Sequence, residues 1–322
     1  MIKILKCLLL TTFLSVLPIT VVASPTAKIT ILVVDNNDIP IENATMSFSF
    51  SRTLEAVTGE KGEVTIKRKL KHKIIRSYVQ IDKNAKELSE SVYIKVNAKG
   101  FYETAYRYNG FLSKKGAWGF RKWEPWNLKL KIVLKKKLNP IPMYAYYVDR
   151  FHIPYKGDEN GYVGFDLMKH DWVHPAGNGI VADLLFKIDK LDNSLGELSV
   201  GVSNSGDGIK HFFTPRFLGS ILRSDYHAPE DGYKNKVTRK SSTYVESPYY
   251  KNNDGPLNNY YFRIRCLNNK SESCFYGKIR GGFYFAEDWI TFNYYLNPSI
   301  GDKNVEFDVN KNLFKSSRRP SP

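Results

Sequence analysis

The strongest constraint on the fold is the alternation of apolar and charged side chains over residues 128–135, LKLKIVLK. Successive side chains of a β-strand point to opposite faces of a sheet, so this period of two predicts a strand with one buried and one solvated face. Short segments of the same kind, bounded by Gly, Asn and Pro, recur through both halves of the chain, and only residues 82–90 offer a turn or two of helix. The pattern predicts an all-β protein.

Two prolines divide the chain. Pro140 and Pro142 lack the backbone N–H that a sheet needs and force extended geometry on the residues before them, as in a short stiff linker. The stretches on either side are each long enough for a β-sandwich, and the second, with six or more short strands, suits a jelly-roll-like one. The predicted organisation is a sandwich over residues 28–138, a linker over 139–142, a second sandwich over 143–314 and a polar, disordered tail over 315–322.

Three segments of the first half carry a resemblance to a known family. They are ITILVVDNNDIPIENATMSF, TGEKGEVTI and IKVNAKGFYE, in that order, and the unit closes on IVLKKK. Together they resemble the carboxypeptidase regulatory-like, or transthyretin-like, domain, an immunoglobulin-like β-sandwich. The resemblance implies a non-catalytic accessory fold and no cofactor. Most of the remaining chain, including NPIPMYAY and GFDLMKHDWV, resembles uncharacterised secreted bacterial proteins that pair such a domain with a second β-unit.

The first residues predict export. Lys3 and Lys6 precede an apolar run, and small residues follow up to Ala23, as in a secretory signal peptide over residues 1–23. The alternative is an uncleaved anchor helix, which the short apolar run and Pro18 disfavour. No later stretch is apolar enough to cross a membrane, so we expect a periplasmic or extracellular protein without a transmembrane segment in its mature form.

Export makes the two remaining cysteines informative. Cys266 and Cys274 frame CLNNKSESC between two strand-like segments, a spacing that suits opposed positions of a hairpin. We predict a disulfide; the alternative is a pair of packed, reduced thiols, which an oxidising compartment disfavours.

The positive charge is concentrated in the first half. The whole chain has a formal net charge of +16, with 23 Lys and Arg against 11 Asp and Glu over residues 28–138, and 23 against 21 over residues 139–322. A basic sheet face of this kind attracts anionic envelope polymers or polysaccharides, although it also serves as an ordinary solvated face whose lysines discourage strand addition. Nucleic acid is the less favoured polyanion, because no nucleic-acid-binding module is recognisable.

The segment MKHDWVHPAGNG offers the nearest match to a metal site. On a helix, His170 and His174 would share one face, but Pro175 disfavours that conformation, and on a strand the two imidazoles would be roughly 13 Å apart. We therefore expect a structural turn in which Trp172 is a buried anchor, and no bound metal. The two histidines are weak candidate ligands only if the loop folds back on itself.

Five acidic residues form an alternative site. They are Asp225, Glu230, Asp231, Asp302 and Glu306. Carboxylates on facing loops could hydrolyse glycosides or bind calcium, although ordinary turns and solvent-facing strands also use them. Serine-nucleophile, zinc-protease and phosphate-loop motifs are absent from the sequence, and a disulfide would leave no cysteine for catalysis.

An aromatic insertion is the candidate binding surface of the first half. In GAWGFRKWEPWN, Trp118, Trp123 and Trp126 cluster along the sequence with Arg121 and Lys122. Exposed tryptophans beside a cation could stack on sugar rings; the alternative is that they cover the sandwich core. From the sequence we therefore expect an exported, non-catalytic accessory protein that contacts an anionic polymer, with an extracellular hydrolase using the C-terminal carboxylates as the alternative.

Overall fold

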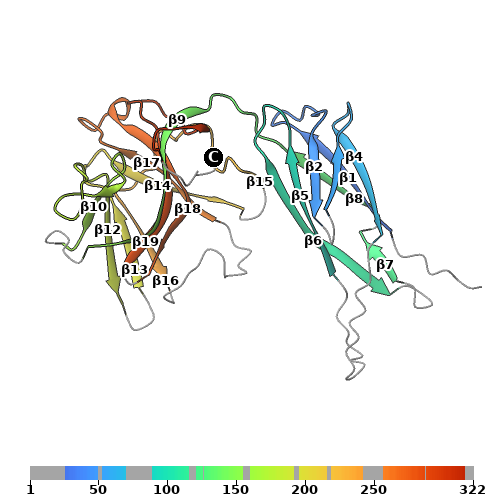
Figure 1. The fold of residues 1–322 in the computed structure, drawn as a ribbon, viewed down its shortest axis with the longest axis horizontal. Coiled ribbons are helices and arrows are strands. Elements are labelled where there is room, and N and C mark those ends of the chain that lie inside the picture. Colours follow the sequence, from blue (N-terminus) through green and yellow to red (C-terminus); the bar gives the residue numbers. More distant parts are fainter. Residues whose placement is uncertain are drawn as a thin grey trace, which may run out of the picture.

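The computed structural model describes most of the chain as β-strands. The described residues are 26–49, 53–69, 89–115, 121–125, 127–154, 160–191, 196–215, 219–241, 257–286 and 288–315. Their only helical element is a single 3-10 turn at Ser271–Ser273, and the strands form packed sheets in two lobes (Figure 1). The predicted all-β sandwich class is confirmed. The predicted signal peptide and all but the first residue of the predicted tail lie outside the described residues.

The N-terminal lobe consists of two sheets that enclose one core. The first sheet has the order β4-β1-β8, and the second has the order β15-β6-β5-β2-β3, with β7 also paired to β6. The strands are β1 (Thr26–Val34), β2 (Thr45–Ser49), β3 (Thr53–Val57), β4 (Glu63–Lys69), β5 (Ser89–Asn97), β6 (Thr104–Lys115), β7 (Arg121–Glu124) and β8 (Asn127–Val133). Fully buried Ile31, Phe48 and Ile94 belong to the core between the sheets. The alternation in β8 follows the prediction, because Leu128 and Ile132 are buried while Lys129 and Lys131 are exposed.

The C-terminal lobe is a second pair of sheets. Their orders are β11-β10-β12-β13-β16 and β14-β17-β18-β19-β9-β20. The strands are β9 (Ile141–His152), β10 (Val163–Asp166), β11 (Asp171–Trp172), β12 (Leu184–Lys190), β13 (Gly196–Gly201), β14 (Gly208–Thr214), β16 (Lys236–Ser241), β17 (Leu257–Ile264), β18 (Phe275–Phe285), β19 (Trp289–Leu296) and β20 (Phe307–Asn312). Phe165, Phe186 and Phe292 form an aromatic core between the sheets, with ring centroids 5.4–6.3 Å apart.

A disulfide closes the end of the β17–β18 hairpin. Cys266 and Cys274 are bonded, with Cα atoms 4.1 Å apart, directly beyond the strand pair Ile264↔Phe275. The predicted bridge is therefore confirmed. No helix among the described residues is long and apolar enough to cross a membrane.

A short strand from the C-terminal lobe joins the two lobes. β15 (Gly219–Ser220) pairs antiparallel with the start of β6, and the Ile221 N–H donates to the Glu103 carbonyl at 2.8 Å (Figure 1). Ser220 and Thr104, paired across this contact, are both buried. The lobes are therefore connected by sheet hydrogen bonds as well as by the proline-containing segment.

Candidate anion-binding site

The segment that resembles a metal site forms a turn held by carboxylates. His170 stacks on Tyr146, with ring centroids 4.6 Å apart, and His174 is exposed. Asp171 Oδ1 accepts the Trp172 N–H at 2.8 Å and its Oδ2 accepts the Asn178 N–H at 2.8 Å. No three His, Cys, Asp or Glu side chains in the described part of the chain are grouped to hold a metal ion.

Trp172 is the buried anchor of this turn, as predicted. Its side chain is buried and its indole Nε1 donates to the His152 carbonyl at 2.8 Å. Gly177 is needed because a Cβ there would lie 2.5 Å from both Asp171 Oδ1 and the Trp172 carbonyl oxygen. The turn thus leaves no space for a side chain at that position.

The aromatic insertion lies largely outside the described residues. Trp118 and Trp126 are not described, while Arg121 and Trp123 belong to β7, of which the structure describes the backbone pairing with β6. Its role as a sugar-binding surface stays a prediction.

The five acidic candidates have separate protein partners. Glu230 pairs with Lys303, Asp231 with Lys210, and Asp225 Oδ2 accepts the Tyr261 hydroxyl at 3.4 Å. Asp302 and Glu306 also accept hydrogen bonds from other parts of the protein.

Asp302 Oδ1 accepts the Asn304 N–H at 3.0 Å, within its own turn. Glu306 is buried and accepts hydrogen bonds from Tyr102 and Leu138 of the N-terminal lobe and from Asn139 of the linker. None of the five acidic candidates lines either of the two pockets described below.

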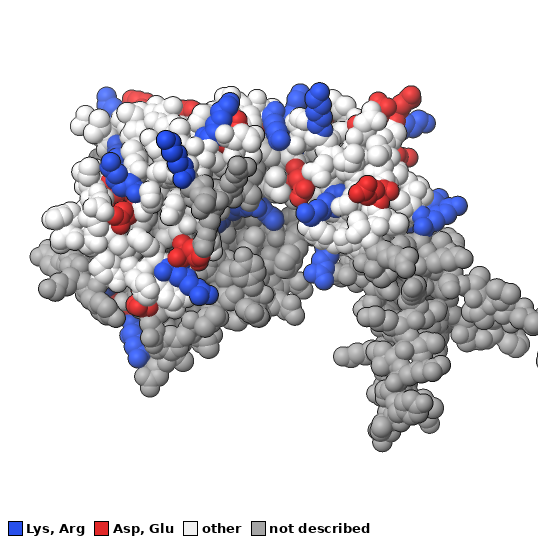
Figure 2. Space-filling model, viewed as in Figure 1, with Lys and Arg blue, Asp and Glu red and all other residues white. Residues whose placement is uncertain are grey.

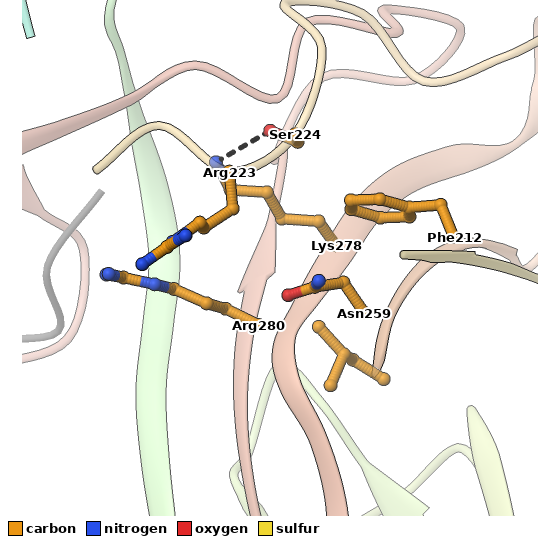
Figure 3. Close-up of a pocket in the computed structure, with 7 residues that line it drawn as sticks. Phe212, Arg223, Ser224, Asn259, Lys278 and Arg280 are labelled. Carbon is orange, nitrogen blue, oxygen red and sulfur yellow. Dashed lines mark hydrogen bonds between the residues drawn. The ribbon is translucent and has the colours of Figure 1, made fainter. Parts of the chain in front are cut away.

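Basic side chains converge in a recess of the C-terminal lobe that faces the junction. We call it the basic pocket, and define it by its lining residues Phe212, Arg223, Ser224, Asn259, Lys278, Ile279 and Arg280. The strands β14, β17 and β18 supply all of these except Arg223 and Ser224, which follow β15. Arg223 and Arg280 lie side by side with their guanidinium groups pointing the same way, and Lys278 extends behind them (Figure 3).

Lys278 is the most buried cation of the basic pocket. Its ammonium donates a hydrogen bond to Ser224 Oγ at 3.1 Å and lies 5.1 Å from the centre of the Tyr295 ring. Burial, together with the charges of Arg280 and Lys135, lowers the pKa of Lys278 from its ordinary value to about 7. The protonated form therefore lacks much of the stabilisation that it would have in water.

The N-terminal lobe adds a further cation. Lys135, two residues beyond β8, donates to the Ser224 carbonyl at 3.0 Å, so that Ser224 bridges cations from the two lobes. Burial lowers the pKa of Lys135, and burial followed by the charge of Arg280 lowers that of Arg223. Clustered cations that disfavour one another's charge are stabilised by an anion placed among them.

In this conformation the basic pocket is too narrow to hold a water molecule, so binding of an anion there requires its side chains to move. Figure 2 shows Lys and Arg mixed with Asp and Glu on this side of both lobes, with basic side chains in the hollow between them.

Sequence reasoning did not find the basic pocket. Lys278 and Arg280 stand two residues apart in FYGKIRGGFYF, so they share one face of a strand. Alternation assigns such a face to solvent, whereas Ser224 and the Tyr295 ring contact Lys278 here. The available signal was the pair of cations inside a run of otherwise aromatic and small residues.

Comparison with known proteins assigns the chain to no family. No protein-family model and no curated protein matches the chain. Among solved structures, a DUF3823 family protein from Parabacteroides merdae aligns at 7% identity and a TM-score of 0.21, covering 88% of this chain and 100% of that one. At that TM-score the alignment supports no inference about family or function.

Proposed function

We propose that the chain is an exported, non-catalytic accessory protein that binds an acidic polysaccharide through the basic pocket. The observation that carries the proposal is the convergence of Lys135, Arg223, Lys278 and Arg280 around Ser224, with Lys278 buried. A carboxylate or sulfate group seated there would neutralise cations in a medium of low dielectric constant, where each interaction is stronger than at the surface.

The sheet face of the N-terminal lobe is the weaker candidate for the anion contact. Lys129 and Lys131 are exposed on β8, and Lys131 already pairs with Asp38 at 2.7 Å. Solvent and salt screen such charges, so this face contributes attraction over distance and little selectivity.

Binding has more support than hydrolysis by the five acidic candidates. Glu230 and Asp231 pair with lysines, and buried Glu306 holds the junction of the lobes. No pair of the five faces another across either described pocket, as glycoside hydrolysis would need.

Retention on immobilised polygalacturonate and dextran sulfate, with uncharged dextran as reference, tests the proposal. Arg280→Gln should weaken retention about tenfold or more, because it removes a cation from a desolvated cluster. The matched control is the double variant Lys129→Gln/Lys131→Gln, which removes two exposed cations and should reduce retention by less than about threefold. A large loss in the control with none in Arg280→Gln would move the contact to the sheet face and overturn the proposal.

A further inference from the structure

A second, larger groove lies at the end of β9, and the proposed function does not use it. Its volume is about 470 Å³, within the range of roughly 300–1,000 Å³ typical of small-ligand sites. It is lined by residues 150–154, by Asp171, Trp172 and Ala176 of the turn described above, and by Asp288 just before β19. We call it the β9 groove.

The base of the β9 groove is aromatic and firmly held. Phe151 stacks on Trp172, with ring centroids 5.5 Å apart and ring planes 15° apart, and Trp172 packs edge-on against buried Phe165. The Trp172 indole is also fixed by its hydrogen bond to the His152 carbonyl. Phe151 is half-buried and lines the β9 groove. A rigid, partly exposed aromatic surface favours a ligand with an apolar face.

The rim of the β9 groove carries donors and acceptors close together. His152 Nδ1 lies 2.9 Å from Asp288 Oδ2, and both side chains are accessible to solvent. In the part of the chain that the structure describes, Nδ1 is the His152 ring nitrogen that the protein engages, which leaves Nε2 to solvent or a ligand. The Arg150 guanidinium lies over the Trp289 ring at 5.9 Å, and Arg150 also lines the β9 groove.

The charged residues at the rim of the β9 groove indicate which class of ligand it binds. Arg150 carries one positive charge, whereas Asp171 and Asp288 carry two negative charges, so an anion gains little here. Arg150, and the backbone N–H groups that already bond Asp171, offset part of the attraction for a simple cation. A neutral ligand with many hydroxyl groups both donates to the carboxylate and accepts from the guanidinium and imidazole.

We infer that the β9 groove binds a neutral sugar residue, which lays one face on Phe151 while its hydroxyl groups bond to Arg150, His152 and Asp288. The ring face supplies apolar contact, and the paired donors and acceptors fix its orientation. This site is separate from the basic pocket, since the two share no lining residue.

Calorimetric titration with cello-, xylo- and malto-oligosaccharides tests the inference on the mature protein. At least one of the three should bind, and Asp288→Asn and Arg150→Gln should each weaken its affinity about tenfold, because each removes a hydrogen-bonding partner of the sugar. Asp189→Asn, which changes an exposed carboxylate paired with Lys187 on the same lobe, is the matched control and should bind normally.

The outcomes separate the two sites. Arg280→Gln should bind the neutral oligosaccharide as the unaltered protein does, even where its retention on polygalacturonate is lost. Absence of binding to all three neutral probes, or binding that both Asp288→Asn and Arg150→Gln leave unchanged, would overturn the inference. Displacement of the neutral probe by galacturonate oligomers in the Arg280→Gln variant would show that the groove takes acidic sugars instead, and would overturn it as well.

Discussion

The hydroxyl of Tyr102, in the N-terminal lobe, donates a hydrogen bond of 3.0 Å to Oε1 of Glu306, in the C-terminal lobe. The same carboxylate accepts the backbone N–H groups of Leu138 at 2.9 Å and Asn139 at 2.6 Å. Burial and the Glu306 charge raise the pKa of Tyr102 well above its ordinary value, so it donates throughout the physiological range. One buried carboxylate thus ties together the two lobes and the segment between them.

Glu306→Gln should destabilise the protein by about 2–4 kcal/mol. The NH2 group of the glutamine would face an N–H or O–H donor at a position where a carboxylate oxygen now accepts a hydrogen bond. The matched control is Glu230→Gln, which alters a largely exposed carboxylate and should cost less than about 1 kcal/mol. Urea unfolding of both variants measures the difference. Equal losses would show that Glu306 does not hold the junction.

Arg265 forms a second buried ionic group with two carboxylates. Its guanidinium bonds Asp183 at 2.7 Å and 2.8 Å and Asp166 at 2.9 Å, and both carboxylates are buried. Arg265→Met should cost about 3–5 kcal/mol at pH 7, since it leaves two buried charges without their cation.

The loss from Arg265→Met should be smaller at pH 5. Burial already raises the pKa of Asp183 to about 6, above its unfolded value, and loss of the cation raises it further. A carboxyl whose folded pKa is raised is neutral below that pKa, so the variant loses stability as the pH increases through it. Thermal unfolding at pH 5 and pH 7 measures the difference, with Lys187→Met as control for a partly exposed ion pair; a pH-independent loss would contradict the explanation.

The disulfide should stabilise the β17–β18 hairpin. Replacing Cys266 and Cys274 by Ala should cost roughly 2–3 kcal/mol in the chain-entropy model, because the bridge closes a short loop of the unfolded chain. Reductant should lower the melting temperature of the native protein and leave that of the double variant unchanged. Thiol titration of the denatured protein lacking residues 1–23 should detect neither cysteine; two free thiols would contradict the bridge.

Local patterns predicted the parts of this fold that local physics determines. The alternation in β8, the Cys266–Cys274 hairpin and the burial of Trp172 each follow from side chains within a few residues of one another. β15 could not be predicted in the same way, because its two residues, Gly219 and Ser220, are too few to show an alternation of apolar and polar side chains. Its pairing depends on a β6 edge that is more than 100 residues away in the sequence.

The sites depended still more on long-range packing. Lys278 follows the ordinary pattern of a solvated strand position, yet it is buried and contacts Ser224 and the Tyr295 ring, which are distant from it in the sequence or on another strand. Glu306 was one of five candidate acids, and its burial and its hydrogen bonds from Tyr102, Leu138 and Asn139 distinguish it from the others. The sequence alone does not show whether a charged side chain near a lobe junction is solvated or buried, because that depends on the surface that packs against it.

Lys278 should couple stability and ligand binding to protons near neutral pH. Its folded pKa of about 7 lies below its unfolded value, so between these two values the unfolded chain binds more protons and stability increases with pH. Lys278→Met removes this dependence, and should stabilise the protein by about 1–4 kcal/mol at pH 6, where the unaltered side chain is charged and buried.

An anion in the basic pocket would favour the charged ammonium, so binding of polygalacturonate near pH 8 should take up a proton. Titration calorimetry in buffers of different ionisation enthalpy measures that uptake, and Lys278→Met should abolish it. Binding without proton uptake in the unaltered protein would place the anion away from Lys278.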